Sequence, residues 1–265
     1  MKKIISILFI ASGILLADRR YYVWTYQYAT MERGNGEIEH YLTFKIPELK
    51  SPEGNVVTEL WLELEVGMND HFDASLYQMF QQVPGFPLEY KGYKIRLRKR
   101  FGEKNKYFLD PLIYFEYKGV PDFHKHAFEG KLILAKDLGK FNISLNPIFE
   151  YEVEKGEKNF DPEYALGLSY SFHELLRLGI EFKGKEGANY FGPVISHGKD
   201  HLWVTLGSAF KIGKIEKGNP EAEIRLLVGI HSLTPPKKEE NLKEKFMKLI
   251  EEGMKIMKEM KEKEE

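Results

Sequence analysis

Cysteine is absent from this chain, which excludes disulfides, thiol catalysis and cysteine-based metal sites. Long apolar runs are also missing after residues 4–16, and that run is shorter than the roughly 20 residues that a membrane-spanning helix needs. The formal net charge of −1 argues against nucleic acid as a partner. Since the sequence has neither a glycine-rich phosphate loop nor an HExxH motif, we expect no cofactor.

The first residues have the pattern of a secretory signal. A basic start at Lys2 and Lys3 precedes the apolar run, and the small residue Ala17 stands before a polar stretch. This order predicts a signal peptide over residues 1–17 that is cleaved near Ala17. The abundance of Lys and Glu is typical of thermophilic proteomes.

Residues 35–233 repeat one pattern, in which about ten residues alternate between apolar and polar before a break follows. Only every second residue of a membrane-barrel strand faces lipid, which reconciles such a barrel with a mean hydropathy of −0.41. The expected strands are Asn35–Ile46, Val57–Gly67, His71–Gln81, Lys91–Phe101, Tyr107–Lys118, His126–Lys136, Lys140–Val153, Glu163–Phe172, Leu175–Lys183, Asn189–Ser196, Asp200–Ile212 and Glu221–Leu233.

The breaks between the expected strands alternate between short turns and longer connections. Short turns are expected at 68–70, 102–106, 137–139, 173–174 and 197–199, and longer ones at 47–56, 82–90, 119–125, 154–162, 184–188 and 213–220. An even number of strands with short turns on one side is typical of single-chain bacterial barrels whose termini lie in the periplasm. Pro111 and Pro147 fall inside expected strands, where each predicts a bulge or a later strand start.

The signal, strand lengths, turn alternation and aromatic residues near strand ends resemble a bacterial outer-membrane β-barrel protein of a generic porin-like or transporter type, over residues 1–233. The resemblance implies an all-β, antiparallel up-and-down transmembrane β-barrel of about 12 strands in the outer membrane. Outer-membrane lipid and the barrel assembly machinery would be its partners. The last strand, Ile224–Leu233, is similar to the closing-strand signal that this machinery recognises, although it ends in Leu rather than an aromatic residue.

Charged side chains occupy the polar positions of several expected strands and would face the lumen. Lys94, Arg96, Arg98 and Arg100 form a basic row, while Glu residues form acidic rows on the first two strands. The complete set of expected pore-lining residues is Glu37, Glu39, Glu59, Glu63, Glu65, Lys94, Arg96, Arg98, Arg100, Glu116, Glu150, Glu152, Arg177, Glu181, Glu223 and Arg225.

These rows are compatible with two functions. Opposed rows across open water would make a narrow channel or passive transporter for small polar or charged solutes. Rows that pair across the lumen would fill it and leave a structural or anchoring barrel. Twelve strands fall between the filled barrels of about eight strands and the open channels of 16–18 strands, so strand number does not decide between them.

Chemistry-bearing motifs are few. Membrane phospholipases of this architecture place a His two residues before the nucleophilic Ser, whereas Ser171 and His173 have the reverse order, so we expect no enzyme of this lipid-modifying class. Asp122, His124 and His126 share one expected external loop and offer alternating metal-ligand types. Nothing in the sequence completes a site around them, and a solvated polar loop is the expectation.

Two segments flank the expected barrel. Residues 18–34 are rich in aromatic residues and are expected to plug the lumen or to lie at the periplasmic interface. Residues 234–265 change to a helical period and predict a charged amphipathic helix in the periplasm, with an apolar face that includes Leu242, Phe246, Leu249 and Ile256. This face, within residues 242–260, is expected to bind a periplasmic partner or a second copy of the chain.

Overall fold

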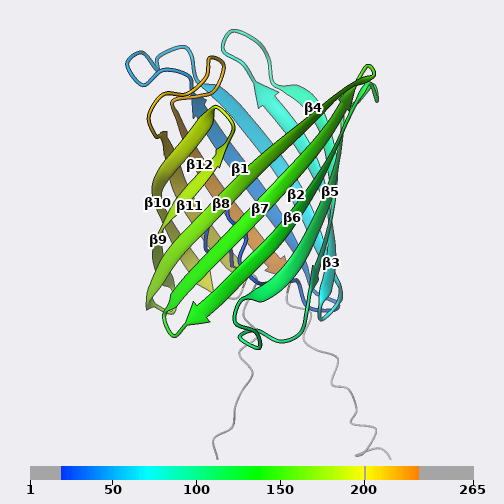
Figure 1. Ribbon diagram of the computed structural model, residues 1–265, viewed down its shortest axis with the longest axis vertical. Coiled ribbons are helices and arrows are strands. Elements are labelled where there is room, and N and C mark those ends of the chain that lie inside the picture. Colours follow the sequence, from blue (N-terminus) through cyan, green and yellow to red (C-terminus); the bar gives the residue numbers. More distant parts are fainter. Residues whose placement is uncertain (1–18, 200, 233–265) are drawn as a thin grey trace, which may run out of the picture. The chain divides into compact units, whose positions relative to one another are not determined.

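The chain forms a closed antiparallel β-barrel of twelve strands in a computed structural model that describes residues 19–199 and 201–232 (Figure 1). Each strand pairs with its neighbours in sequence, and β12 pairs with β1 to close the barrel. The strands are β1 (Gly36–Ile46), β2 (Val57–Asn69), β3 (Phe72–Gln82), β4 (Glu89–Arg100), β5 (Asp110–Gly119), β6 (Lys125–Leu138), β7 (Phe141–Glu154), β8 (Glu157–His173), β9 (Leu176–Lys185), β10 (Ala188–Lys199), β11 (Leu202–Lys211) and β12 (Ala222–Ser232).

The prediction of an all-β antiparallel barrel with twelve strands is confirmed. The expected signal peptide and the expected C-terminal helix lie outside the described residues. Within the described part of the chain, no helix has the length and apolar character to cross a membrane.

The two faces of the strands follow the predicted alternation. On β2 the side chains of Glu63 and Glu65 are 1% exposed, whereas Leu62 and Leu64 are 43% and 52% exposed. A shift of one residue would exchange these two rows, so this alternation fixes the pairing register.

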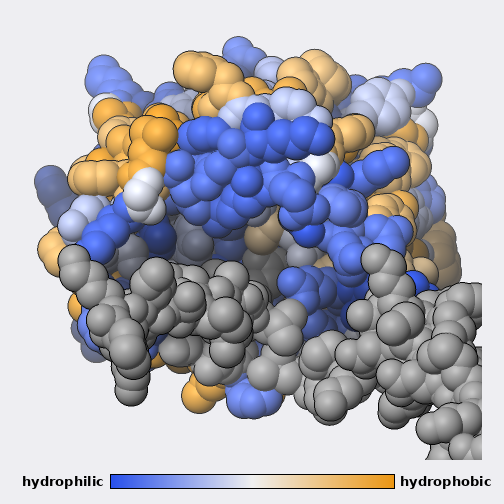
Figure 2. Space-filling view, turned by 90° about the horizontal axis from the view of Figure 1, so that it is seen from below, coloured by the Kyte–Doolittle hydropathy of each residue, from blue (hydrophilic) through white to orange (hydrophobic). Residues whose placement is uncertain are grey.

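The outer surface of the barrel carries large apolar side chains on nearly every strand. Examples are Ile113 and Phe115 on β5 and Leu202 on β11, all exposed although they are hydrophobic. Viewed from the lower end of Figure 1, hydrophilic residues gather inside the ring and hydrophobic residues lie around its edge (Figure 2). An apolar exterior around a polar interior is the arrangement of a barrel that lies in lipid.

The connections differ from the predicted alternation. At the upper end of Figure 1, the β7–β8 and β9–β10 connections are two-residue turns at 155–156 and 186–187, where longer loops were expected. At the lower end, β4 and β5 are joined by residues 101–109, which is longer than the expected turn at 102–106. The reason is local: β8 starts at Glu157 rather than Glu163, since Lys155 adopts a positive φ of 50° and Gly156 one of 91°, and together they close a tight hairpin.

The two strand prolines have different consequences. Pro111 is the second residue of β5, so the strand starts later than expected and the missing N–H lies at its end. Pro147 lies within β7, where the β6–β7 pairing skips two residue pairs and then resumes in the same register. The proline therefore removes a hydrogen bond without the bulge that was one of the expected outcomes.

Residues 19–35, here called the plug segment, run inside the lower half of the barrel and precede β1 (Figure 1). Tyr22, Val23 and Thr25 are at most 1% exposed because strand side chains surround them. Gly67 on β2 allows the closest approach, since a Cβ atom at this position would collide with the backbone oxygen of Glu32. The plug segment is therefore a packed part of the molecule.

Candidate functional site

One carboxylate of the barrel wall binds three consecutive residues of the plug segment. Glu181 on β9 accepts hydrogen bonds from three consecutive backbone N–H groups, those of Val23, Trp24 and Thr25, at 3.0, 2.9 and 2.7 Å. Hydrogen bonds to an ionised group contribute about 1.5–3 kcal/mol each. Glu181 was predicted to face the lumen, and there it anchors the segment that crosses it.

Neutral side chains of the wall complete this attachment. Asn146 on β7 accepts a hydrogen bond from the Tyr26 N–H at 2.6 Å and donates one to the Tyr26 carbonyl at 3.0 Å, as a neighbouring strand would. The hydroxyls of Ser196 and Thr205 both donate to the Arg20 carbonyl at 2.7 Å. Almost all of these contacts are made by side chains, and the barrel closes without any strand from the plug segment.

The lower half of the lumen contains a dense network of arginines and carboxylates. Arg96 lies 2.7 Å from Glu63 and also pairs with Glu65, and all three side chains are at most 1% exposed. Arg98 pairs with Glu65 and lies 2.8 Å from Asp73. Two members of the acidic row of β2 and two of the basic row of β4 are therefore joined in ion pairs, and they do not face each other across open water.

Above the plug segment the lumen opens into a cavity of about 460 Å³. Its floor includes Val23, Trp24 and Tyr26 of the plug segment, and its lining reaches Asn219 and Pro220 of the β11–β12 loop at the upper end. A second cavity of about 170 Å³ is lined by other plug-segment residues, together with Arg100, Lys104 and His231 near the lower end. The plug segment thus contributes to both cavities and interrupts the path between them.

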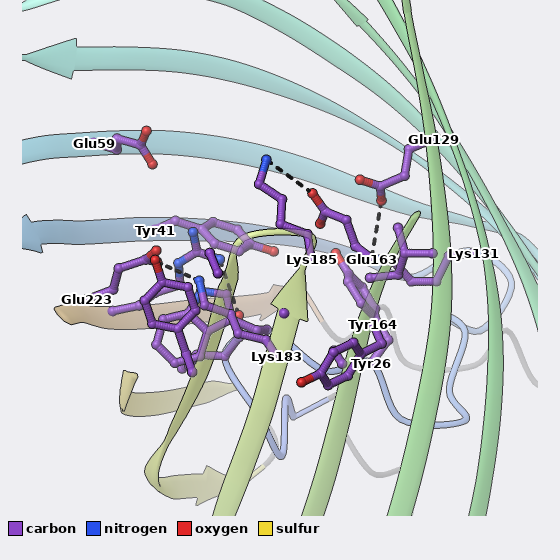
Figure 3. Close-up of a pocket in the computed structure, with 18 of the residues that line it drawn as sticks. Tyr26, Tyr41, Glu59, Glu129, Lys131, Glu163, Tyr164, Lys183, Lys185 and Glu223 are labelled. Atoms are coloured by element: carbon purple, nitrogen blue, oxygen red, sulfur yellow. Dashed lines mark hydrogen bonds and ion pairs between the residues drawn. The ribbon is translucent and has the colours of Figure 1, made fainter. Parts of the chain in front are cut away.

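The upper cavity is lined by lysine–glutamate pairs. Lys45 and Glu59 lie 2.6 Å apart, and Lys183 and Glu223 lie 2.7 Å apart. Glu129 pairs with Lys131 at 3.2 Å, and in Figure 3 these side chains point into the cavity from β6. Aromatic rings lie between the charged groups, and the Lys183 ammonium is 4.5 Å from the centre of the Trp24 ring.

The structure places the predicted pore-lining charges in four groups. Those buried in the lower half or against the plug segment are Glu37, Glu39, Glu63, Glu65, Arg96, Arg98, Arg177 and Glu181. Those that line the upper cavity are Glu59, Lys94, Glu116, Glu223 and Arg225. Arg100 lines the lower cavity, while Glu150 and Glu152 are half-buried on β7, where they pair with Lys118 and Lys125.

The predicted metal-ligand types are only partly brought together. Asp122 and His124 form a hydrogen bond, which lowers the pKa of the Asp122 carboxyl. His126 instead bonds the Tyr117 hydroxyl at 2.7 Å and stacks on its ring. Among the described residues, no three His, Asp or Glu side chains are grouped so that they could hold a metal ion.

Ser171 and His173 do not form a nucleophile–base pair. The Ser171 hydroxyl donates to the backbone oxygen of His173 at 3.0 Å, and the His173 Nδ1 accepts the Leu175 N–H at 3.3 Å. The imidazole therefore has no hydrogen bond to the serine hydroxyl that it would have to deprotonate.

Several residues at this site were missed by the sequence analysis. Asn146 and Asp73 hold the plug segment, but a polar residue facing the lumen gives no sign of the backbone that it bonds. Lys131 faces the cavity next to Glu129, and both alternate with Phe128 and Leu132. The period-2 pattern of β6 could therefore have identified these two charges.

Comparisons with known proteins agree with this geometry. No family model matches the chain, and no curated protein does. Among solved structures, an outer-membrane channel from Pseudomonas putida F1 is similar, with a TM-score of 0.60 and 8% identity, over 80% of this chain and 100% of that one. The fold is that of an outer-membrane β-barrel. The KdgM porin (TM-score 0.52, 11% identity, 74% of this chain and 98% of that one) and the NanC porin (0.51, 8%, 75% and 99%) are also similar. At these identities the likeness concerns the fold alone.

Proposed function

We propose that the protein is an outer-membrane channel for small polar or charged solutes, and that its own N-terminal segment closes the lumen. The observation that carries this proposal is the plug segment between two cavities, attached to a barrel that is complete without it. Among the described residues, the backbone hydrogen bonds between the plug segment and the wall are those that Gly34 and Asn35, next to β1, form with Gly67. Release of the other contacts would join the two cavities and leave the strand pairing intact.

The location is supported by the apolar exterior and by the similarity in fold to an outer-membrane channel and porins. Cells that express the gene should hold the mature protein, starting near Asp18, in the outer-membrane fraction. Its mobility on an unheated gel should differ from that of the boiled protein. Recovery as a water-soluble monomer without detergent would contradict the proposed location.

The channel proposal is tested in planar bilayers with and without the plug segment. The full chain should remain closed most of the time, whereas a variant that lacks residues 18–34, which include all of the plug segment except Asn35, should show discrete conductance steps. If the shortened barrel keeps its heat-modifiable mobility and never conducts, the channel proposal is wrong.

A reversible cross-link gives a matched control, because the chain has no other cysteine. A Cβ atom at Gly207 on β11 would lie 2.5 Å from Cγ2 of Val23, so the Cβ atoms of a V23C/G207C pair would be at most about 4 Å apart, near the spacing of a disulfide. The oxidised variant should stay closed, and reduction should restore openings. Openings of equal frequency in both states would show that the segment is not the gate.

The alternative is a structural or anchoring barrel with a filled lumen, which the arginine–carboxylate network favours. In this alternative the proposed helix of residues 234–265 would dock a periplasmic partner or a second copy. Truncation after Leu233 should then remove an oligomer band or a cross-link and leave the barrel assembled. Replacement of Phe246 and Leu249 by Asp should have the same effect, and an unchanged oligomer pattern in both variants would exclude the docking role.

A further inference from the structure

Arg225 on β12 differs from the other wall cations around the upper cavity. Its Nε donates to the Thr43 hydroxyl at 2.8 Å and its Nη1 to the Val23 carbonyl at 3.4 Å. Whereas Lys183 and Lys94 each pair with a glutamate, Arg225 forms no ion pair with any carboxylate of the described residues. Its Nη2 donates to no group in the described part of the chain, although the residue lines the cavity.

Two tryptophans flank this guanidinium. The Arg225 Cζ atom lies 5.4 Å from the Trp24 ring centre and 5.2 Å from that of Trp61, which places one indole of the plug segment and one of β2 beside it. Lys183 lies over Trp24 at 4.5 Å and Lys94 over Trp61 at 4.1 Å. The indole Nε1 of Trp24 is buried without a hydrogen-bond partner in the described residues. Hydrogen-bond donors without a partner among the described residues, on Arg225 and Trp24, therefore lie close to the indole rings of Trp24 and Trp61 in one part of the cavity.

Cations outnumber carboxylates on the surface of the cavity. Eight lysine and arginine side chains line it, against five glutamates. Three of these cations, Arg20, Lys118 and Lys185, also pair with carboxylates outside the lining, and Arg225 is left without a carboxylate of the described residues. Because a charge beside low-dielectric walls concentrates ions of the opposite sign, Arg225 favours an anionic occupant over a cationic one.

We infer that the upper cavity is a binding site for a small organic oxyanion, with Arg225 as the direct partner of its carboxylate or phosphate group. The planar guanidinium can bind such a group through two donors, which a lysine cannot do. The apolar body of the solute would lie against Trp24 and Trp61. A volume of about 460 Å³ lies within the roughly 300–1,000 Å³ of small-molecule sites. The inference rests on the proposed function, since it names the class of solute that the channel admits.

Tryptophan fluorescence tests the site without requiring conduction. The chain has three tryptophans, and Trp203 is fully buried with its Nε1 donating to Glu37. Quenching by ions in solution therefore reports mainly Trp24 and Trp61. Each slope is divided by the slope that the same ion gives with free N-acetyltryptophanamide, because iodide and caesium differ in intrinsic quenching efficiency. In the full chain, this relative Stern–Volmer slope should be at least about twofold larger for iodide than for caesium, because the cavity concentrates anions. A relative slope for caesium equal to or larger than that for iodide would overturn the inference.

Matched probes separate binding from general attraction. Cyclohexanecarboxylate should protect the tryptophans from iodide in a saturable way, whereas neutral cyclohexanecarboxamide should not. Inorganic phosphate provides the second arm and shows whether the oxyanion group alone suffices. Equal protection by the carboxylate and the amide would show that the site selects apolar bodies and would contradict the role of Arg225.

Variants identify the residue. Arg225→Gln should lose the protection by cyclohexanecarboxylate and flatten the iodide slope, while Arg225→Lys should keep the slope and weaken the protection. Lys211→Gln serves as the control, because Lys211 pairs with Glu221 and does not line the cavity. Heat-modifiable mobility verifies folding, and if Arg225→Gln fails to fold, the comparison of probes in the full chain still decides. If the barrel without residues 18–34 folds and never conducts while the full chain gives a positive quenching result, the channel is rejected and the site is kept.

Discussion

The two halves of the lumen are built from charged residues of the same signs, yet one half is packed and the other is hollow. In the lower half, Arg96 and Arg98 pair with carboxylates whose side chains are at most 1% exposed. In the upper half, lysines pair with glutamates around a cavity of about 460 Å³, and Lys45 is 33% exposed at its side chain. The choice of cation thus follows the degree of burial.

The difference follows from the chemistry of the two cations. A guanidinium has five donors in a rigid plane and can satisfy several carboxylates at once without water. An ammonium on a flexible stem is strongly hydrated, so lysine remains where water reaches it. An arginine network therefore closes the lower half, and a lysine lining keeps the upper half accessible. Arg225, a guanidinium in the hollow half without a carboxylate, is the exception to this division.

The largest expected effect comes from breaking the packed half. Arg96→Met would leave Glu63 and Glu65 buried without their shared cation, and removal of one partner of a buried ion pair lowers the free energy of unfolding by about 3–5 kcal/mol. Lys45→Met, the matched change in the hollow half, should lower it by about 1 kcal/mol or less. Urea unfolding in detergent micelles measures both. If the two variants lose the same free energy of unfolding, the ion pairs of the lower half are not more stabilising than those of the upper half.

A smaller effect is expected where the plug segment meets the wall. Glu181→Gln replaces a charged acceptor of three N–H groups with a neutral amide, which should weaken the attachment by about 1.5–3 kcal/mol. Hydrogen exchange of residues 23–25 should then accelerate by about 10- to 100-fold, since 1.4 kcal/mol corresponds to a factor of ten. Exchange in the strands should stay unchanged.

Glu150→Gln is the control for this change, because Glu150 pairs with Lys118 on the wall and no hydrogen bond or ion pair joins it to the described plug segment. It should leave exchange of residues 23–25 as in the unmodified chain. If Glu181→Gln also leaves it unchanged, Glu181 is not the anchor that the geometry indicates.

The sequence predicted the strands of the barrel wall far better than the contacts that side chains make inside the lumen. The alternation of Leu62 with Glu63 records which side of the strand faces lipid, and that is a property of the strand itself. What the inward charges contact depends on side chains brought from distant positions. Arg96 meets Glu63 only because β3 lies between β4 and β2 in the closed barrel, and Glu181 meets Val23 across 158 residues. An inward-facing Glu can therefore either border a water-filled cavity or bind the backbone of another segment. The alternation of apolar and polar residues along its strand is the same in both cases.

The smallest expected effect lies at the rim, where the Lys211–Glu221 ion pair is more exposed than the Arg96–Glu63 and Lys45–Glu59 pairs. Glu221 in the β11–β12 loop accepts hydrogen bonds from the Lys211 ammonium and from the Leu49 N–H, and these lower the pKa of its carboxyl below the usual 4.5. Because the folded-state pKa is depressed, the stabilisation is present above pH 4.5 and is lost as the pH falls through the folded value.

Glu221→Gln should not measurably change the urea midpoint at neutral pH, since exposed pairs contribute little. A ¹³C titration of the Glu221 carboxyl should have its midpoint below 4.5 in the unmodified chain, and Lys211→Gln should shift that midpoint upward. If the midpoint does not move, Lys211 does not set this pKa. The decrease in ion-pair strength from buried arginine to exposed lysine would then reach zero at the rim of the barrel.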